Sequence, residues 1–395
     1  MREGNLKTFP VYLEGRITSD NAADWLGKIQ AEMAAHPGEV PELDAEKLAY
    51  LSSAGLRVLL NLRKAAGKLT IRNVSPEIYE IFETTGFDTL MHVEKKLRQI
   101  SVEGCEVIGK GTYGMVYRLD EDRVVKVYPS AEWLPKMRLD QERARKAFIR
   151  GVPTAIPYDI VRVGERYGAI YEMVKAKSCN EELIAHPEAF PDMMRMYARF
   201  LQSVHQVEMK EGELPDSRGV FLSYLEAIAA ELPEKTAGRL RALVETVPES
   251  LHVIHGDAHL QNIMLSDREW LLIDMDTISA GDPVFEFGPL FMTYRLFIEE
   301  VPEDALAFHG LDAEICRRIF RESLEQYLGG GEEACREAEE KAAVVGLIRF
   351  LYELLVLQEG RNPYHERYMA YALDRLAAVL PRVESLAFGG SAGIH

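Results

Sequence analysis

The segment from His255 to Asp276 contains three polar residues whose spacing narrows what this chain can form. Asp257, Asn262 and Asp274 are separated by 5 and 12 residues, and the apolar run Trp270–Ile273 comes directly before the last of them. A loop followed by a short strand can deliver all three to one cleft. Phosphoryl transfer from a nucleotide needs a carboxylate near the acceptor hydroxyl, and an Asn and a second Asp to hold magnesium on the phosphates. The segment predicts such a site; the alternative is three unrelated polar residues on a surface.

An independent glycine pattern lies upstream of this segment. Gly109, Gly111, Gly114 and Val116 follow the spacing G-x-G-x-x-G-x-V, which is typical of the glycine-rich loop of protein kinases rather than of a P-loop. Glycines let a hairpin backbone approach phosphate oxygens, because no Cβ intrudes and positive φ costs little. Lys126 follows 12 residues after Gly114, inside an apolar strand-like run. We predict that Lys126 binds the α- and β-phosphates; a turn and a lysine lying along a strand surface are the alternatives.

A lysine in this role needs a carboxylate to orient it. Residues 136–149 are expected to form a helix, and we predict that Glu142 on this helix is the partner of Lys126. Asp140 is the competing acid. The alternative for Glu142 is a surface ion pair, which contributes little to stability.

The strand expected at 167–174 runs into a linker whose backbone can pair with the edge of adenine. We predict that the Glu172 carbonyl and the Val174 amide make these bonds. A plain buried strand explains the same residues about as well, because side chains matter little to backbone pairing.

With these motifs, residues 104 to about 388 resemble the aminoglycoside phosphotransferase and choline kinase-like branch of the protein-kinase fold. The matching pieces are His255-Gly256-Asp257, Asn262, Ile273-Asp274-Met275-Asp276 and Gly281-Asp282-Pro283. The resemblance implies an α+β bilobal domain, with an N-lobe at about 104–174 and a largely helical C-lobe at about 175–388.

The resemblance also implies a role for each residue. Asp257 would accept the proton of the acceptor hydroxyl or orient that hydroxyl. Asn262 and Asp274 would bind Mg²⁺ on the phosphates of ATP, with GTP left open as the nucleotide. Asp276 would either assist a second metal or cap the next turn, and His255 would brace the loop rather than act as the base.

The chain departs from protein kinases in the region that follows. It has no Asp-Phe-Gly triplet and no Ala-Pro-Glu motif, and only Thr277 to Asp282 separate Asp276 from Pro283. This leaves no room for a long activation loop, so the resemblance favours the hydroxyl of a small molecule as acceptor. The branch usually has an Asp soon after Gly-Asp-Pro, and Glu286 stands near that place.

The first hundred residues alternate short strand-like and helix-like segments, which predicts a mixed sheet packed by helices. This α/β region resembles the STAS domain of anti-sigma factor antagonists, and we expect it to span residues 1–98. Strand-like segments are Pro10–Glu14, Glu46–Tyr50 before a turn, and Lys68–Ile71; helix-like ones are Asp20–Met33, Leu56–Leu62 and Pro76–Thr84. The resemblance is carried by Leu13–Ile17, Tyr50–Leu56, Val74–Pro76 and Thr85–Phe87.

The STAS resemblance places Ser53 at the position of a serine that is phosphorylated in a partner switch. Ser52 stands where the family has an Asp, so the acidic neighbour is lost. The alternative is that Ser53 or Ser52 only caps the following helix, which stabilises it by about 1 kcal/mol. A phosphate at Ser53 would be favoured by the helix N-terminus and by Arg57.

The composition fits two cores and argues against some partners. The chain has 395 residues, 47% of them apolar, and a net charge of −17 from 46 basic and 63 acidic residues. Such an acidic chain is a poor candidate for nucleic acid or an anionic membrane surface, and is compatible with a cationic acceptor. The four cysteines show no CxxC spacing, and no run approaches a membrane span or a signal core, so we expect a cytoplasmic protein.

Further helices are expected in the C-lobe, and residues 389–395 are expected to form a loose tail. The helices are predicted at Asp192–Val207, Phe221–Leu232, Glu314–Tyr327, Glu333–Gln358 and Glu366–Val379, and residues considered for the acceptor pocket are Tyr352, Glu353, Glu359 and Tyr364. Three functions follow. The first is an ATP-dependent small-molecule phosphotransferase with a STAS module that regulates it or binds a protein partner. The second is a signalling protein that phosphorylates a STAS serine or reports nucleotide state to a partner. The third is a pseudokinase scaffold.

Overall fold

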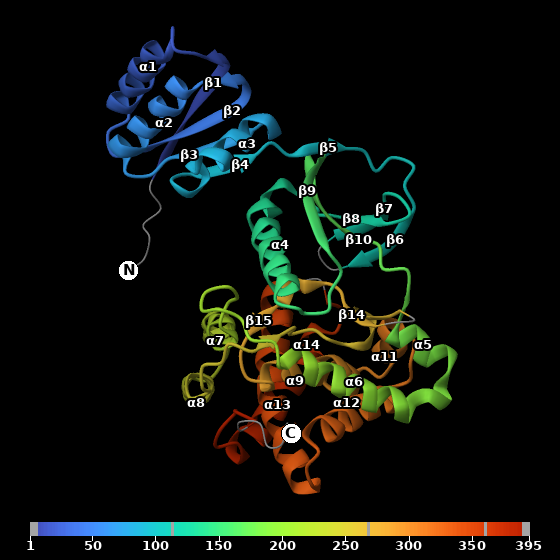
Figure 1. The fold of residues 1–395 in the computed structure, drawn as a ribbon. Coiled ribbons are helices and arrows are strands. Elements are labelled where there is room, and N and C mark those ends of the chain that lie inside the picture. Colours follow the sequence, from blue (N-terminus) through green and yellow to red (C-terminus); the bar gives the residue numbers. More distant parts are fainter. Residues whose placement is uncertain (1–6, 112–113, 267–268, 359–361, 389–395) are drawn as a thin grey trace. The chain divides into compact units, whose positions relative to one another are not determined.

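The chain forms two compact units, and each is described by itself. The structure, a computed structural model, describes residues 7–111, 114–266, 269–358 and 362–388. One unit comprises Met1–Ser101 with Ile160–Gly164, and the other Val102–Asp159 with Glu165–His395 (Figure 1). The predicted tail at 389–395 and Glu359 lie outside the described residues.

The first unit is a four-stranded sheet with helical crossovers. Its strands are ordered β1-β2-β3-β4, and every neighbouring pair is parallel. The elements are β1 (Thr8–Ile17), α1 (Ala22–Ala35), β2 (Val40–Leu51), α2 (Ser53–Ala66), β3 (Thr70–Val74), α3 (Pro76–Thr85), the turn Phe87–Thr89 and β4 (His92–Lys95). The α/β class is confirmed, but the expectation of a mixed sheet is wrong for these strands. Each strand is joined to the next by a helix, and such a crossover makes neighbours parallel.

Alternating apolar residues hold this sheet against its helices. Val11, Leu43, Ile71 and Val93 are aligned across the four strands, and the first three are buried. Side chains of a strand alternate between its two faces, so this row marks the face that packs. Ile29 of α1, Leu62 of α2 and Phe82 of α3 are completely buried in the same core, which shows that all three helices contribute to it.

The second unit begins with an antiparallel sheet and one long helix. β10, β8, β7 and β6 are neighbours in that order, and all of these pairs are antiparallel where their register is defined. The elements are β6 (Val107–Gly111), β7 (Gly114–Arg118), β8 (Arg123–Val127), α4 (Leu134–Ile149) and β10 (Arg166–Glu172). The last residues of β9 (Pro157–Val163) are counted with the first unit, where they pair in parallel with β5 (Arg98–Ile100).

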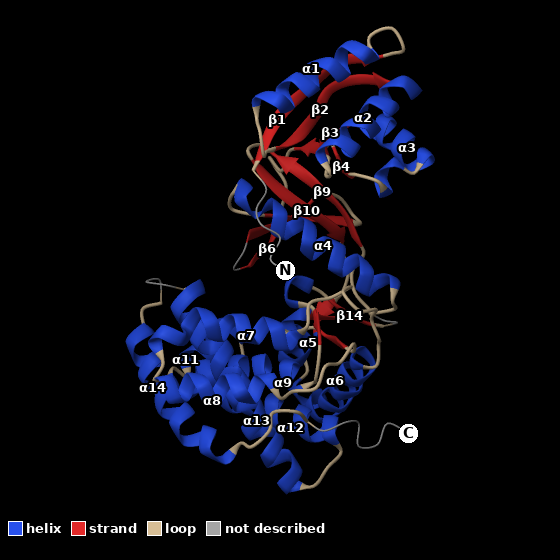
Figure 2. Cartoon of the chain, turned by 90° about the vertical axis from the view of Figure 1, so that its left-hand side faces the viewer, coloured by secondary structure: helices blue, strands red, loops and turns tan. Residues whose placement is uncertain are grey.

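The rest of the second unit is mainly helical, as Figure 2 shows in blue. The helices are α5 (Cys179–Ala185), α6 (Phe190–His205), α7 (Ser217–Ile228), α8 (Glu234–Glu245), α9 (Val284–Phe291), α10 (Phe297–Glu300), α11 (Glu303–His309), α12 (Ala313–Leu328), α13 (Glu332–Tyr352) and α14 (His365–Val379). Short strands are β11 (Lys177–Ser178), β12 (Val253–Ile254), β13 (Ile263–Leu265), β14 (Trp270–Leu272) and β15 (Ser279–Ala280). α9 is buried along its whole length and packs against α13.

The predicted C-lobe helices correspond to α6, α7, α12, α13 and α14. The helix expected to reach Gln358 ends as an α-helix at Tyr352 and continues as a π-helical turn, Glu353–Leu357. Helices α5, α8, α9, α10 and α11 were not predicted. Within the described ranges, no helix has both the length and the apolar character that crossing a membrane requires.

Candidate active site

The predicted catalytic loop, His255–Asn262, connects β12 to β13. Gly256 has a φ of +78°, and a Cβ there would lie 3.1 Å from the Thr277 carbonyl oxygen. Only glycine adopts this backbone at little cost in so narrow a space. The Thr277 hydroxyl also donates to the His255 carbonyl at 2.8 Å, so the loop is joined to the segment that follows Asp276.

One buried carboxylate, that of Glu286, binds the backbone of the catalytic loop. Glu286 of α9 is fully buried and accepts hydrogen bonds from the amides of His255 at 2.8 Å, and of Gly256 and Ala258 at 3.1 Å. His205 of α6 lies 3.4 Å from the same carboxylate. Burial alone would raise the pKa of Glu286, but its hydrogen bond with His205 and its electrostatic interactions with His205 and His255 lower it overall. Glu286 therefore fixes the loop as an anion.

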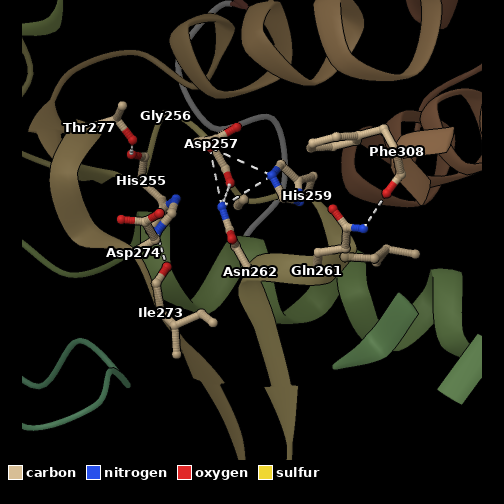
Figure 3. Close-up of polar contacts among 12 residues, drawn as sticks. His255, Gly256, Asp257, His259, Gln261, Asn262, Ile273, Asp274, Thr277 and Phe308 are labelled. Carbon is tan, nitrogen blue, oxygen red and sulfur yellow. Dashed lines mark hydrogen bonds and ion pairs between the residues drawn. The ribbon is translucent and has the colours of Figure 1, made fainter. Parts of the chain in front are cut away.

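Asp257 and Asn262 are in direct contact (Figure 3). The Asn262 side-chain amide donates to the backbone carbonyl of Asp257 at 2.8 Å and to its carboxylate at 3.2 Å. The Asp257 side chain keeps 36% of its exposure, so a ligand can reach it. Burial raises the pKa of Asp257 to about 7, even though the His255 and Arg349 charges oppose the shift. A carboxylate with a raised pKa is a better proton acceptor at neutral pH than an ordinary one.

His259 completes this group and was not predicted. Its Nε2 atom lies 3.3 Å from the amide nitrogen of Asn262 and 3.7 Å from the Asp257 carboxylate. Burial lowers the pKa of His259 to about 4, so its imidazole is neutral at pH 7. Nε2 therefore accepts from Asn262 and Nδ1 carries the proton. The signal that could have revealed it is its place two residues after Asp257 in the same loop.

The catalytic loop is tied to the third predicted residue through His255. The His255 Nε2 atom donates to the Ile273 carbonyl at 3.1 Å, directly before Asp274 (Figure 3). Asp274 has a φ of +59°, a left-handed backbone that non-glycine residues seldom adopt. Such strain is retained where the surroundings fix it, commonly at functional sites. The hydrogen bond of His255 shows it bracing the loop.

Lys126 meets two carboxylates of this second loop. Its ammonium lies 2.6 Å from Asp274 and 2.7 Å from Asp276. Burial alone would lower the pKa of Lys126, but the two carboxylates raise it overall. Lys126 in turn lowers the pKa of Asp274 against burial, while burial and the Asp274 charge raise that of Asp276. Asp276 thus pairs with the lysine, which neither sequence-based alternative included.

The prediction that Glu142 orients Lys126 is wrong in this structure. Glu142 is 59% exposed and pairs with Lys146 one helical turn away at 2.7 Å. Asp140, the competing acid, faces inward: its side chain is 3% exposed, it is paired with Lys136, and burial raises its pKa. Met137, Asp140, Ala144 and Ala147 form the buried stripe of α4. Glu142 lies off that stripe, because a helix repeats every 3.6 residues.

The glycine motif forms the predicted hairpin. Gly109 and Gly111 lie in β6, and Val116 of β7 is the register partner of both Gly109 and Lys126. Gly114 begins β7, and a Cβ there would lie 2.4 Å from the Val127 carbonyl oxygen, so a larger residue would force the strands apart. The tip residues 112–113 lie outside the described residues. Phosphate binding by this hairpin stays a prediction.

Glu172 and Val174 lie where β10 ends. The Glu172 amide donates to the Ile156 carbonyl at 3.0 Å, and its carboxylate accepts from the Ile156 amide at 3.1 Å. The Met173 amide donates to the Asp122 carbonyl at 2.8 Å, and the Val174 carbonyl accepts from Ala176. These bonds fix the linker, and the adenine contacts stay a prediction.

The oxygen atoms near Asp274 fit a magnesium ion. Asp274 is 43% exposed. The hydrogen bonds of Asn262 engage its own amide nitrogen, so the amide oxygen of Asn262 would be left to coordinate a metal ion. Mg²⁺ prefers oxygen ligands and is usually bound by one or two carboxylates together with substrate phosphates. Across the described ranges, no three His, Cys, Asp or Glu side chains converge to form a site of protein ligands alone.

The segment after Asp276 is short and ordered by its own contacts. The 3₁₀ turn Met275–Thr277 leads into β15, which pairs antiparallel with β12. Ser279 of β15 and Ser217 of α7 share a hydrogen bond of 2.7 Å. The chain then enters α9 at Val284. Only residues 277–283 separate Asp276 from α9, so this described segment contains no long loop, as the spacing in the sequence predicted.

Helix α11 also contacts the catalytic loop. The Gln261 side chain donates to the Phe308 carbonyl at 2.7 Å, and the rings of His259 and Phe308 lie 5.7 Å apart (Figure 3). Phe308 remains 56% exposed. Its surface adjoins the loop, a proximity that the sequence did not indicate because α11 was not predicted.

Comparison with known proteins assigns the chain to a family of phosphotransferases. Residues 104–320 match the model of the phosphotransferase enzyme family, and the chain belongs to that family. Residues 4–95 match a STAS domain model described as Mlab, STAS domain. A putative anti-sigma factor antagonist, BtrV from Bordetella bronchiseptica, is 36% identical over 88 residues, which cover 20% of this chain and 72% of that protein. The N-terminal unit is therefore a STAS domain.

Solved structures of similar proteins are more distant. A thermostable mutant of aminoglycoside phosphotransferase APH(4)-Ia with ADP and hygromycin B is 12% identical, with a TM-score of 0.48, and covers 74% of this chain and 98% of that one. Aminoglycoside phosphotransferase APH(2'')-Ib with ADP is 16% identical, with a TM-score of 0.46 and coverage of 78% and 99%. Choline kinase LicA from Streptococcus pneumoniae is 14% identical, with a TM-score of 0.44 and coverage of 76% and 99%.

Proposed function

We propose that this protein transfers the γ-phosphate of ATP, with Mg²⁺, to a hydroxyl of a small molecule, and that its STAS domain regulates the enzyme or binds a protein partner. The observation that carries the proposal is the convergence of Lys126 and Asp274 at 2.6 Å, although 148 residues separate them. His255 links Asp274 to the loop that carries Asp257 and Asn262. Lys126 and the segment from His255 to Asp276, which are distant in sequence, thus lie together.

In this proposal each residue has a stated task. Asp257 takes the proton of the acceptor hydroxyl. The hydroxyl oxygen forms a bond to the γ-phosphorus of ATP, and the bond between that phosphorus and the bridging oxygen breaks, which releases ADP. Lys126 binds the α- and β-phosphates, while Asn262 and Asp274 hold the metal. Magnesium, when bound, offsets the charge of the phosphate oxygens. Membership of the phosphotransferase enzyme family supports transfer of a phosphate group.

The experiment measures ADP released from Mg-ATP in the presence of a panel of hydroxylated metabolites. We expect acceptor-dependent ADP production by the wild type and its loss in Asp257→Asn. No acceptor-dependent turnover, together with no binding of Mg-ATP at millimolar concentration, would refute the proposal. Substituting GTP for ATP in the same assay decides the nucleotide.

A second function is favoured by the helix start at Ser53. The Ser52 hydroxyl caps α2 by accepting from the Gly55 amide at 3.3 Å, whereas Ser53 is the first helical residue and is exposed. The cap is thus made by Ser52, and the Ser53 hydroxyl faces solvent. We propose Ser53 as a regulatory phosphosite in a signalling role. Mass spectrometry of the full chain after incubation with Mg-ATP tests this, and unmodified Ser53 would count against autophosphorylation.

A further inference from the structure

Lys126 is held by two carboxylates that lie two residues apart, directly after β14. The Lys126 ammonium lies 2.6 Å from Asp274 and 2.7 Å from Asp276. In β8, Lys126 has Val116 of the glycine hairpin and Ala169 of β10 as its register partners. The lysine therefore links the antiparallel sheet to the segment that follows β14, and either carboxylate is a candidate for the residue that fixes its position.

The two carboxylates differ in exposure. The side chain of Asp274 is 43% exposed, whereas the side chains of Asp276 and Lys126 are each 10% exposed. Mg²⁺ keeps several of its waters when it binds, and it is usually bound by one or two carboxylates together with substrate phosphates. A hydrated ion that arrives from solvent reaches Asp274 more readily than Asp276. Asp276 is therefore the inner carboxylate of the two, and its contact is with the lysine.

The backbone around Asp276 is fixed on both sides. Met275, directly before it, is 5% exposed, and its carbonyl accepts from the Ile278 amide at 3.3 Å. Thr277, directly after it, donates from its hydroxyl to the His255 carbonyl at 2.8 Å. Asp276 thus lies in a turn that is tied to the catalytic loop, so its backbone is positioned by contacts other than the one with the lysine.

Both acids of α4 are engaged with basic residues of the same helix. Glu142 is paired with Lys146 at 2.7 Å, and Asp140 is paired with Lys136. Each of these pairs joins residues one helical turn apart. The helix that was expected to supply the anion for the lysine of β8 thus directs its acids elsewhere, and the turn after β14 supplies the anions in contact with it.

The ammonium of Lys126 has a donor left for a ligand. An ammonium has three N–H donors and no acceptor, and the two carboxylates engage two of these donors. A metal-bound Asp274 would have part of its charge offset, which weakens its attraction for the ammonium. The contact with Asp276 does not change with the metal. Asp276 can therefore keep Lys126 in place while the ammonium donates to a phosphate.

We propose that Asp276 is the positioning residue of Lys126: its carboxylate holds the ammonium in place to bind the phosphates of ATP, the task expected of Glu142. The inference rests on the function proposed above, in which Lys126 binds the α- and β-phosphates. Asp276 then touches neither the acceptor nor the metal. This role differs from both roles that the sequence suggested for it, a second metal ligand and a cap of the next turn.

A double-mutant cycle tests the inference. Calorimetric titration with Mg-ATP is carried out on the full chain, on Asp276→Asn, on Lys126→Ala and on the double variant. We expect Asp276→Asn to weaken binding about fivefold or more when Lys126 is present and less than about twofold when it is replaced, a coupling within the range for contacting residues of one ion-pair network. Asp276→Glu, which retains the carboxylate, should lose less affinity than Asp276→Asn. A merely structural residue would show neither the coupling nor the rescue.

Two further variants serve as comparisons. Asp274→Asn should weaken binding about fivefold or more with and without Lys126, because it acts through magnesium. Asp140→Asn is the matched control, because Asp140 is also a buried acid paired with a lysine; whatever its effect on binding, that effect should be the same in both backgrounds. Thermal melting confirms that each variant is folded, and Asp276→Ser repeats the cycle if Asp276→Asn does not fold.

Three results would overturn the inference. The first is a loss in Asp276→Asn that is equally large in the Lys126→Ala background, which would indicate a second metal ligand or support of the fold. The second is unchanged or tighter binding by Asp276→Asn, which would make Asp276 dispensable or a competitor of the phosphates. The third is a wild type that does not bind Mg-ATP, which refutes the proposed function as well. Saturable binding by the wild type with additive variants overturns this inference alone.

Discussion

The catalytic loop, residues 255–262, and a cluster of four side chains are held in place by different kinds of interaction. The cluster consists of Tyr224, Arg349, Tyr352 and Glu353. The loop is bound through its backbone: the amides of His255, Gly256 and Ala258 donate hydrogen bonds to the buried Glu286 carboxylate. The cluster is held through side chains, by a charge contact of 3.6 Å and by stacked rings. The hydrogen bonds to Glu286 involve only the backbone of the loop, whereas the cluster depends on the identity of each side chain in it.

The largest expected effect is at Asp257. Asp257→Asn removes the proton acceptor but preserves the shape of the loop, so kcat should fall by about 10²- to 10⁴-fold, the usual contribution of general base catalysis. Mg-ATP affinity should stay within about threefold, because Asp257 is assigned to the acceptor. Steady-state kinetics and calorimetry measure both. A variant with nearly full kcat would show that the loop does not carry the chemistry.

The second-largest effect is expected at Glu286, which binds the backbone of the catalytic loop. Glu286→Ala leaves three backbone amides without their buried acceptor, and each unsatisfied group costs at least about 1 kcal/mol. We expect the free energy of unfolding to fall by about 3 kcal/mol or more. Urea unfolding in a Trp25→Phe background follows the second unit alone, since Trp133 and Trp270 both lie there. Tyr352→Phe, in the cluster, is the comparison and should cost far less. Equal losses would remove the distinction between the two regions.

The same carboxylate predicts a pH dependence. The folded-state pKa of Glu286 is lowered, since His205 and its hydrogen bonds outweigh burial. A lowered pKa stabilises the fold above the pKa of the unfolded chain, and this stabilisation is lost as pH falls through the folded-state value. Unfolding midpoints should therefore decline on acidification more steeply in the wild type than in Glu286→Gln. Parallel curves for the two proteins would contradict the prediction.

The smallest effect is expected on α4. Glu142→Gln removes only an exposed ion pair with Lys146, so stability should change by less than about 0.5 kcal/mol and Mg-ATP affinity should not change. Asp140→Asn replaces the buried acid of the same helix and should have the larger effect on both quantities. Reversal of that order would restore Glu142 as the partner of Lys126.

The two regions also differ in how far the sequence predicts them. The proximity of Asp257, Asn262 and Asp274 could be predicted because the first two lie in one loop and the third follows the next strand pair. The choice of Glu142 over Asp140 was wrong. Which of the two acids faces inward depends on how α4 is rotated about its axis, and the positions of these two residues alone do not define that rotation. The sequence shows Glu286 near the place where the family usually has an Asp. Its hydrogen bonds to the loop, however, follow from the packing of α9, which was not predicted. Tyr224 and Arg349 come together only through tertiary contacts between α7 and α13, which no local pattern specifies.

The central claim is that Lys126 and the Asp274 loop form a nucleotide site, and calorimetric titration of the full chain with Mg-ATP tests it most directly. We predict saturable binding of one ATP per chain, reduced about 10-fold or more in Lys126→Ala, which loses charged hydrogen bonds to phosphate, and unchanged in Glu142→Gln. Absence of binding at millimolar Mg-ATP, or equal binding by the wild type and a folded Lys126→Ala variant, would contradict the account.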